Sequence, residues 1–239
     1  MDLSSHFHVQ NIALRVLRDV APFIREGITE REVAAICIRL LKQYGAGESW
    51  YHNVGALVLV GERTTLSASG KVYQPSALAI GKQDLVTIDL SPMVDGYWGD
   101  CARSYIVESG VVAQPGATSG LYHGIEALRQ LHQLMMETAA PHTTMHQLFM
   151  AMNQAIKDRG YKNLDFRGNL GHSIGKHLDD RRYIEADNHT TLGSCGLFTF
   201  EPHICRCGDS WGFKMENIYY FEDSVAVPLG SPELLEACR

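Results

Sequence analysis

Two aspartates interrupt β-favouring stretches of the sequence, and their spacing predicts a shared cation site. Asp89 lies within DLVTIDL and Asp100 lies directly before CARSYIV, with Asp95-Gly96 between them. Asp-Gly is a strong signal for a two-residue hairpin loop. In such a hairpin Asp89 faces Ala102, so the two aspartates are diagonal neighbours on one face, with Cα atoms about 7–8 Å apart. Turn aspartates would lie closer to the loop, so we expect both carboxylates to converge on one cation.

A weak internal repeat predicts that the elements carrying these acids occur twice. GITEREVAAICIRLLKQYGAG (27–47) resembles HTTMHQLFMAMNQAIKDRGYK (142–162), because each has a candidate helix N-cap, Thr29 or Thr144, followed by apolar residues at helical spacing. A helix-like run precedes each copy and strand-like segments follow it. We therefore predict one domain, 1–239, made of two similar halves at about 1–115 and 116–239.

The repeat also draws attention to two glutamates. Its offset of 115 residues carries Asp89 and Asp100 to positions beside Glu201 in LFTFEPHI and Glu216 in FKMENIYYF. Both glutamates lie inside apolar, strand-like runs. Each half is therefore expected to contribute a pair of strands that carry acids.

Four carboxylates in apolar strands require positive charge nearby, since each unpaired buried ion costs several kcal/mol. Only Arg103 and Lys214 lie in these strands, which is too few for four acids. Two divalent cations would balance the four charges, whereas one would leave two uncompensated. His172 offers a nitrogen ligand, and its neighbours Gly171 and Gly175 permit close approach of the backbone. We therefore predict a dinuclear metal site.

Composition excludes several other classes of protein. The chain has 239 residues, of which 45% are apolar, enough for a substantial core. No window approaches the roughly 20 apolar residues of a membrane span, and the amino-terminal run reads as an amphipathic helix, so a cytoplasmic protein is expected. The net charge of −6, without a basic run, argues against nucleic acid and anionic membranes as partners. The 6 cysteines show no zinc-type Cys-x2-Cys pairs and are expected to be reduced thiols.

Five stretches together resemble the pita-bread metallohydrolases, which include methionine aminopeptidase, Xaa-Pro aminopeptidase and prolidase. In chain order they are Ile88-Asp89, Gly96-Tyr97-Trp98-Gly99-Asp100, Gly171-His172-Ser173-Ile174-Gly175, Glu201-Pro202 and Met215-Glu216-Asn217. The resemblance covers nearly the whole chain. It implies an α+β pita-bread (creatinase/aminopeptidase) fold, in which two pseudo-twofold αβ halves form a curved, mainly antiparallel sheet over the metal site.

The resemblance also implies a role for each ligand. Asp89 would chelate one metal, while Asp100 and Glu216 would bridge both. His172 and Glu201 would bind the second metal, and Glu201 would also shuttle a proton. Four oxygen donors and one imidazole favour Mn(II), Fe(II) or Co(II), and Zn(II) is compatible.

Two positions depart from the family pattern. Classical peptidase members have a histidine in a His-Tyr-x-Pro segment, where this chain has Val72, and another seven residues beyond the ligand histidine, where it has Asp179. In the family these imidazoles hold the scissile carbonyl and stabilise the oxyanion. Neither valine nor an ionised aspartate can donate a hydrogen bond to an oxyanion.

Four nearby side chains could replace the missing imidazoles. His203 follows Glu201 by two residues, so on a strand both would point to the same face. His177 lies five residues after the ligand histidine, in a segment without a regular pattern. Lys71 and Tyr73 flank the valine gap. We predict His203 as the principal substitute.

Three functions fit these residues. The first is a dinuclear metal-dependent hydrolase, related to aminopeptidases, that splits an amide bond in a non-standard peptide or small amino-acid derivative. The second is a non-hydrolytic, lyase-like enzyme on the same metal pair, which altered residues around the metals would suit. The third is a binding module that has lost turnover, although such a module would not need four converging acids. A homodimer is compatible with all three.

Overall fold

The computed structural model describes residues 3–113, 120–165 and 167–238. The predicted boundary between the halves, at residues 115 and 116, lies outside these residues. The described α-helices are α1 (Ser4–Val20), α2 (Glu30–Gln43), α3 (Tyr122–Thr138), α4 (Met145–Asp158) and α5 (Pro232–Ala237). Short 3-10 helices are η1 (Ala21–Phe23), η2 (Gly61–Thr65), η3 (Leu178–Asp180) and η4 (Leu192–Cys195).

The strands are short and pair in an antiparallel manner wherever the structure describes a pairing. In chain order they are β1 (Glu48–Ser49), β2 (Ala56–Val60), β3 (Asp84–Leu90), β4 (Pro92–Val94), β5 (Tyr97–Trp98), β6 (Cys101–Glu108), β7 (Val111–Val112), β8 (Tyr161–Asn163), β9 (Phe198–Phe200), β10 (His203–Arg206), β11 (Gly212–Lys214), β12 (Asn217–Glu222) and β13 (Val225–Pro228). They form four sheets, ordered β2-β3-β6-β7, β1-β4-β5, β11-β10-β8 and β13-β12-β9.

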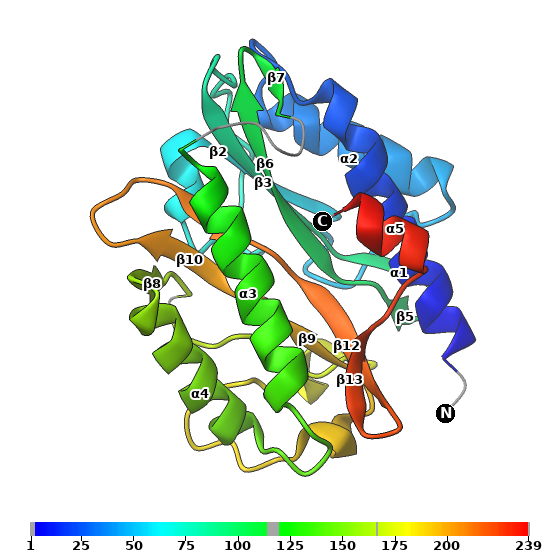
Figure 1. The fold of residues 1–239 in the computed structure, drawn as a ribbon. Helices are drawn as coiled ribbons and strands as arrows, with labels where there is room; N and C mark the ends of the chain where they lie inside the picture. The colour runs from blue at the N-terminus through cyan, green and yellow to red at the C-terminus, as the bar shows by residue number, and fades with distance from the viewer. Residues whose placement is uncertain (1–2, 114–119, 166, 239) are drawn as a thin grey trace.

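The helices enclose these sheets from two sides. Helices α1 and α2 pack on strands of the first half, and α5, from the end of the chain, packs beside α1. Helices α3 and α4 pack on strands of the second half (Figure 1). A bridge between Ala102 and Glu216 joins the two sets of strands. The strands that carry acids therefore meet where the two halves touch.

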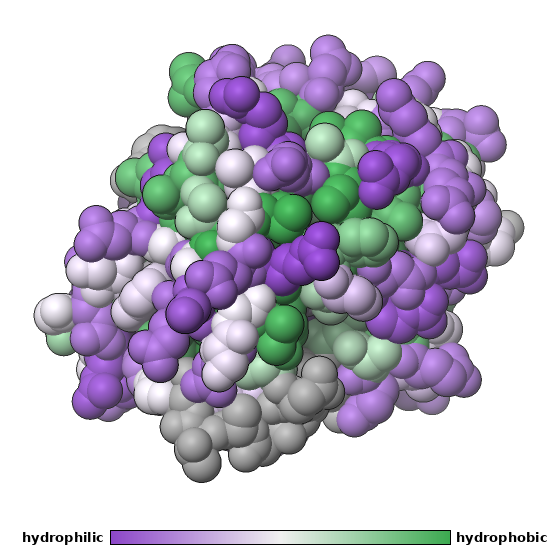
Figure 2. Space-filling model, turned by 90° about the horizontal axis from the view of Figure 1, so that it is seen from above, coloured by the Kyte–Doolittle hydropathy of each residue, from purple (hydrophilic) through white to green (hydrophobic). Residues whose placement is uncertain are grey.

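Two large apolar clusters lie in the molecule, one mainly in each half. The first gathers residues of α1, α2, β2 and β3, including Leu14, Val33 and Ile88. The second gathers residues of α3, α4 and β9 to β13, including Leu128 and Phe200. The face of the molecule seen from above is largely hydrophilic, with an apolar area near its middle (Figure 2). No helix in the described part of the chain is long and apolar enough to cross a membrane.

Both predicted N-caps are confirmed. The Thr29 side chain accepts a hydrogen bond from the backbone of Glu32, whose side chain accepts one from the backbone of Thr29. Thr144 and Gln147 form the same reciprocal pair at the start of α4. Two capping boxes 115 residues apart show that the repeated motif begins the second helix of each half in the same way.

The predicted hairpin has the expected register, but its two strands are interrupted. Asp95 and Gly96 both have positive φ, 51° and 79°, as a two-residue loop of type I′ requires. Asp89 pairs with Ala102, as expected. Instead of two continuous strands, however, the segment forms four, because the pairing breaks between β3 and β4. Pro92 lacks a backbone N–H, so it cannot donate to the neighbouring strand. Among the described residues, a single backbone hydrogen bond crosses the break, from the Gly99 N–H to the Pro92 carbonyl.

Candidate metal centre

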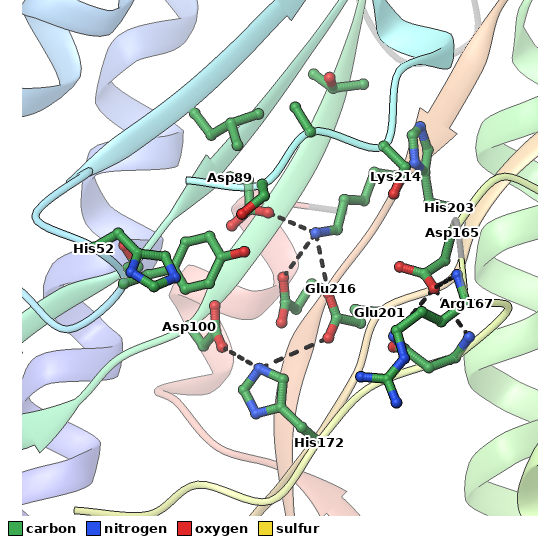
Figure 3. A pocket seen from close by; sticks show the side chains of 18 of the residues that line it. His52, Asp89, Asp100, Asp165, Arg167, His172, Glu201, His203, Lys214 and Glu216 are labelled. Carbon is green, nitrogen blue, oxygen red and sulfur yellow. Dashed lines mark hydrogen bonds and ion pairs between the residues drawn. The ribbon is translucent and has the colours of Figure 1, made fainter. Parts of the chain in front are cut away.

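All five predicted ligands line one pocket of about 310 Å³ (Figure 3). They come from five places in the fold: Asp89 from β3, Asp100 from the residue directly before β6, His172 from a bridge opposite Tyr183, Glu201 from the residue directly after β9 and Glu216 from the residue directly before β12. The pocket therefore combines side chains from both halves.

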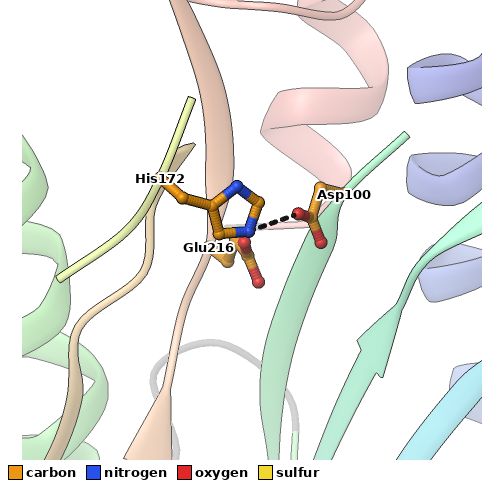
Figure 4. A group of neighbouring side chains, drawn as sticks. All are labelled: Asp100, His172 and Glu216. Atoms are coloured by element: carbon orange, nitrogen blue, oxygen red, sulfur yellow. Dashed lines mark ion pairs between the residues drawn. The ribbon is translucent and has the colours of Figure 1, made fainter. Parts of the chain in front are cut away.

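Three of these side chains form a tight inner group. Asp100, His172 and Glu216 each present a ligand atom within 4.8 Å of the other two (Figure 4). They are only 3%, 5% and 1% exposed. Among the described residues this is the group of histidine, cysteine and acidic side chains that could hold a metal ion.

The imidazole of His172 is held in the form that binds metals. Its Nδ1 lies 3.0 Å from the carbonyl of Ser173, which can only accept a hydrogen bond, so Nδ1 carries the proton. Nε2 faces Asp100 Oδ2 at 3.5 Å and Glu201 Oε1 at 3.8 Å. Burial lowers the pKa of His172. The neutral ring therefore points a lone pair at two carboxylates, which suits a cation between them.

Unpartnered oxygen atoms support the same conclusion. Asp100 Oδ2 and both carboxylate oxygens of Glu216 are buried without a hydrogen-bond partner. Burial, with repulsion from neighbouring acids, holds the pKa of both carboxyls well above the usual range. Buried oxygens of this kind are costly unless a cation satisfies them. The donor set of two carboxylates and one imidazole fits a divalent ion.

A lysine also occupies the cluster. Lys214 Nζ lies 2.5 Å from Asp89 Oδ2, 3.1 Å from Glu201 Oε2 and 3.5 Å from Glu216 Oε2. Although burial opposes the charge, the three carboxylates hold the pKa of Lys214 well above its usual range. Burial likewise opposes ionisation of Glu201, but the Lys214 ammonium holds its pKa below the usual value. One internal cation therefore already compensates part of the acidic charge.

Arg103, the other basic residue of these strands, serves a different purpose. Its guanidinium is buried and donates to the backbone carbonyls of Ala102, Glu216 and Cys238 and to the side-chain oxygen of Asn217. It thus fixes the backbone of a predicted ligand rather than neutralising an acid.

A glycine brings the ligand histidine onto β9. Gly171 has φ 142°, and a Cβ atom there would lie 2.2 Å from the carbonyl oxygen of Thr199. The Thr199 N–H donates to the His172 carbonyl, and the Thr199 hydroxyl accepts the His172 N–H at 2.9 Å. Because Glu201 follows two residues later, this contact also sets the distance between the two ligands. The glycine serves close approach of backbone to backbone, rather than the expected approach of backbone to a metal or substrate.

The predicted substitutes for the missing imidazoles lie in different environments. His203 lines the pocket, but its Nε2 donates to the Thr64 carbonyl at 2.7 Å, and burial lowers its pKa to about 4. Its Nδ1 therefore carries no proton, and the predicted role as an oxyanion donor does not fit this arrangement. His177 and Asp179 are exposed and lie outside the pocket lining.

The segment around Val72 is also turned away from the ligands. Val72 is 75% exposed and does not line the pocket. The Tyr73 hydroxyl bonds to the backbone of Val58. Of this segment's predicted candidates, only Lys71 lines the pocket.

Sequence reasoning missed one wall of the pocket. The guanidinium of Arg181 lies over the rings of Trp50, Tyr51 and Tyr183, at 5.2 to 5.6 Å from their centres. The Trp50 ring also lies 5.5 Å from the His172 ring. Trp50 and Tyr51 are far from the other residues of this wall in the sequence, and no motif connects them.

The pocket thus holds a buried cluster of acids and one imidazole at the junction of the two halves. The chain belongs to metallopeptidase family M24, whose model matches residues 6–227. It therefore has the α+β pita-bread fold, and the resemblance found in the sequence is confirmed. The ligand set remains a prediction.

Relatives and solved structures agree with this family. The chain is 27% identical over 224 residues to an uncharacterised peptidase of Schizosaccharomyces pombe, covering 93% of this chain and 46% of that protein. It is 29% identical over 185 residues to an Xaa-Pro dipeptidase of Pyrococcus furiosus, covering 76% and 48%. The chain thus spans about half the length of these relatives. The prolidase structure from Pyrococcus furiosus superposes with a TM-score of 0.74 at 25% identity, over 93% of this chain and 62% of that one.

Proposed function

We propose that the protein is a metal-dependent hydrolase that cleaves an amide bond at the amino terminus of a short peptide or in a small amino-acid derivative. The observation that carries this proposal is the inner group of Asp100, His172 and Glu216, which lines a pocket. Three of its buried carboxylate oxygens have no hydrogen-bond partner. A pocket of about 310 Å³ suits a small substrate.

We propose two divalent ions at full loading, of the Mn(II), Fe(II) or Co(II) type. Asp100, His172, Glu201 and Glu216 would hold one, and Asp89 would hold the other together with Asp100 and Glu216. When bound, such ions supply Lewis-acid stabilisation and ionise water at neutral pH.

Glu201 is the proposed proton carrier. Its side chain is partly open to the pocket, at 19% exposure, and the Lys214 ammonium keeps it ionised. An ionised carboxylate in this place can accept a proton from the attacking water and deliver it to the leaving amine. Trp50 and Tyr51 would exclude bulk water along one side of the substrate.

The test is a screen of metal-loaded protein against short peptides and small amides, with products identified by mass. Hydrolysis adds one water across the products, and Glu201→Gln should lower turnover by about 10²-fold or more, because it cannot carry the proton. A lyase-like reaction, which the departures at Val72 and Asp179 keep as the second candidate, would release products without added water. Absence of any turnover across the library would contradict both enzymatic functions.

A further inference from the structure

We infer that Lys214 occupies the place of the second metal ion and makes the two ions bind unequally, the first to the inner group and the second only after the ammonium withdraws. This inference rests on the proposed metal centre, because it concerns how that centre fills. It assigns to Lys214 the role of a positioning residue that competes with a cation.

The carboxylates divide around two points in the pocket. Asp100 faces the His172 Nε2 lone pair, and Glu216 completes a group whose geometry suits a single ion. Asp89 lies outside this group and makes its shortest contact with Lys214 Nζ. An ion at the first point meets the ammonium only at its edge, where Lys214 Nζ lies 3.5 Å from Glu216 Oε2. An ion that needs Asp89 instead meets an ammonium already in place at hydrogen-bond distance (Figure 3).

The lysine can both hold this place and leave it. Its backbone is fixed at the end of β11, where Lys214 N donates to Ser104 Oγ and the same hydroxyl donates to the Lys214 carbonyl. The side chain is 18% exposed, so its flexible stem can carry the ammonium toward solvent without moving the strand. The competition therefore needs only a rotation of the side chain.

The interactions that hold the ammonium set the size of the effect. Withdrawal of Lys214 Nζ breaks a charge-assisted hydrogen bond to Asp89 and a close ion pair with Glu201. Bonds of this kind change affinity by roughly tenfold or more. We therefore expect the second ion to bind at least about tenfold more weakly than the first.

The experiment is a calorimetric titration of metal-stripped protein with Mn(II), with electron paramagnetic resonance to detect spin-coupled ion pairs. Wild type should bind one ion tightly and a second more weakly, with coupled signals only at the second equivalent. Lys214→Met should reduce the difference between the two affinities by about tenfold. Lys214→Arg should retain it, since the charge remains.

Lys71→Met is the matched control, because Lys71 lines the same pocket and makes no ion pair among those the structure describes. It should leave both affinities close to wild type. Equal affinities in wild type, or a difference that Lys214→Met leaves unchanged, would overturn the inference. The titration contains no substrate, so its result does not depend on catalysis. If the two ions bind unequally but the substrate screen finds no amide cleavage, the proposed function is refuted and the inference about Lys214 stands.

Discussion

At the scale of single residues, Lys214 sets the charge balance of the cluster, because its ammonium pairs with Asp89, Glu201 and Glu216. Asp89, Asp100 and Glu216 lie in one pocket because alternation along strands and a family motif both fix their direction. The same alternation places Lys214 on the face of Glu216, two residues away, and that signal was available. Counting charges in the strands did not reveal that a single lysine contacts three acids at once.

Asp100→Ala should abolish metal binding at the inner group and with it turnover, while the fold remains intact. Asp100 is buried with an unpartnered oxygen, so in metal-free protein its removal relieves repulsion rather than breaking a bond. We expect metal-free Asp100→Ala to unfold at a temperature equal to or above that of metal-free wild type. Elemental analysis and thermal unfolding measure the two effects. Normal metal content in the variant would exclude Asp100 as a ligand.

Substitution of His203 tests whether this residue is an oxyanion donor or has only a structural role. Because its Nε2 donates to Thr64, His203→Gln can retain that bond through its amide and should keep turnover within a few-fold. Loss of an oxyanion donor would instead lower turnover by about 10²–10³-fold. Such a loss in His203→Gln, with unchanged stability, would show that His203 is a donor after all.

Asp179 is exposed outside the pocket, so Asp179→His should not raise cleavage of ordinary dipeptides. We still expect weak activity on such dipeptides, because two donors are missing.

At the scale of elements, local signals succeeded where the cause was local. Threonine caps set the starts of α2 and α4, and Asp95-Gly96 set the hairpin register. The break between β3 and β4 was missed, although Pro92, which lacks a backbone N–H, marks it in the sequence. The pairing of β4 with β1, from an earlier part of the chain, had no local signal. The direction of His177 could not be predicted, since the segment after β8 has no repeating pattern.

Gly171→Ala should disturb the centre through the strand that supports it. A Cβ atom at 2.2 Å from the Thr199 carbonyl would force the two backbones apart, and φ 142° strains any other residue. We expect a loss of stability of about 1–3 kcal/mol and weaker binding of Mn(II). Gly175→Ala is the control on the other side of His172, where the nearest atom is a side-chain carbon at 3.1 Å. Equal metal affinity in both variants would argue against this role for Gly171.

At the scale of the whole molecule, the repeat predicted that two similar halves exist but not how they meet. Their junction depends on contacts such as the bridge between Ala102 and Glu216 and the bonds of Arg103 to the carboxy-terminal region. These pairs are more than 100 residues apart in sequence, so no local pattern announces them. The motifs were sufficient to predict the fold class, whereas the shape of the pocket depends on this junction.

The pH dependence of unfolding tests the core of the second half. His132 of α3 is buried between the Tyr219 hydroxyl and the Met215 carbonyl, and burial lowers its pKa to about 3. The unfolded chain binds a proton near pH 6.5 while the folded chain does not, so this residue lowers stability as the pH falls from about 6.5 to about 3 and has no effect above that range.

The expected contribution of His132 is about 1.4 kcal/mol per pH unit within that range. Urea unfolding of metal-free His132→Gln should therefore show a shallower loss of stability between about pH 6 and pH 4, about one proton less than wild type. Comparison with wild type cancels the opposite contribution of Asp100 and Glu216, whose raised pKa favours the folded state at low pH. His142→Gln, at an exposed position, should retain the wild-type slope. If His132→Gln also retained the wild-type slope, we would conclude that His132 is reached by water and protonated in the folded protein, rather than buried and neutral.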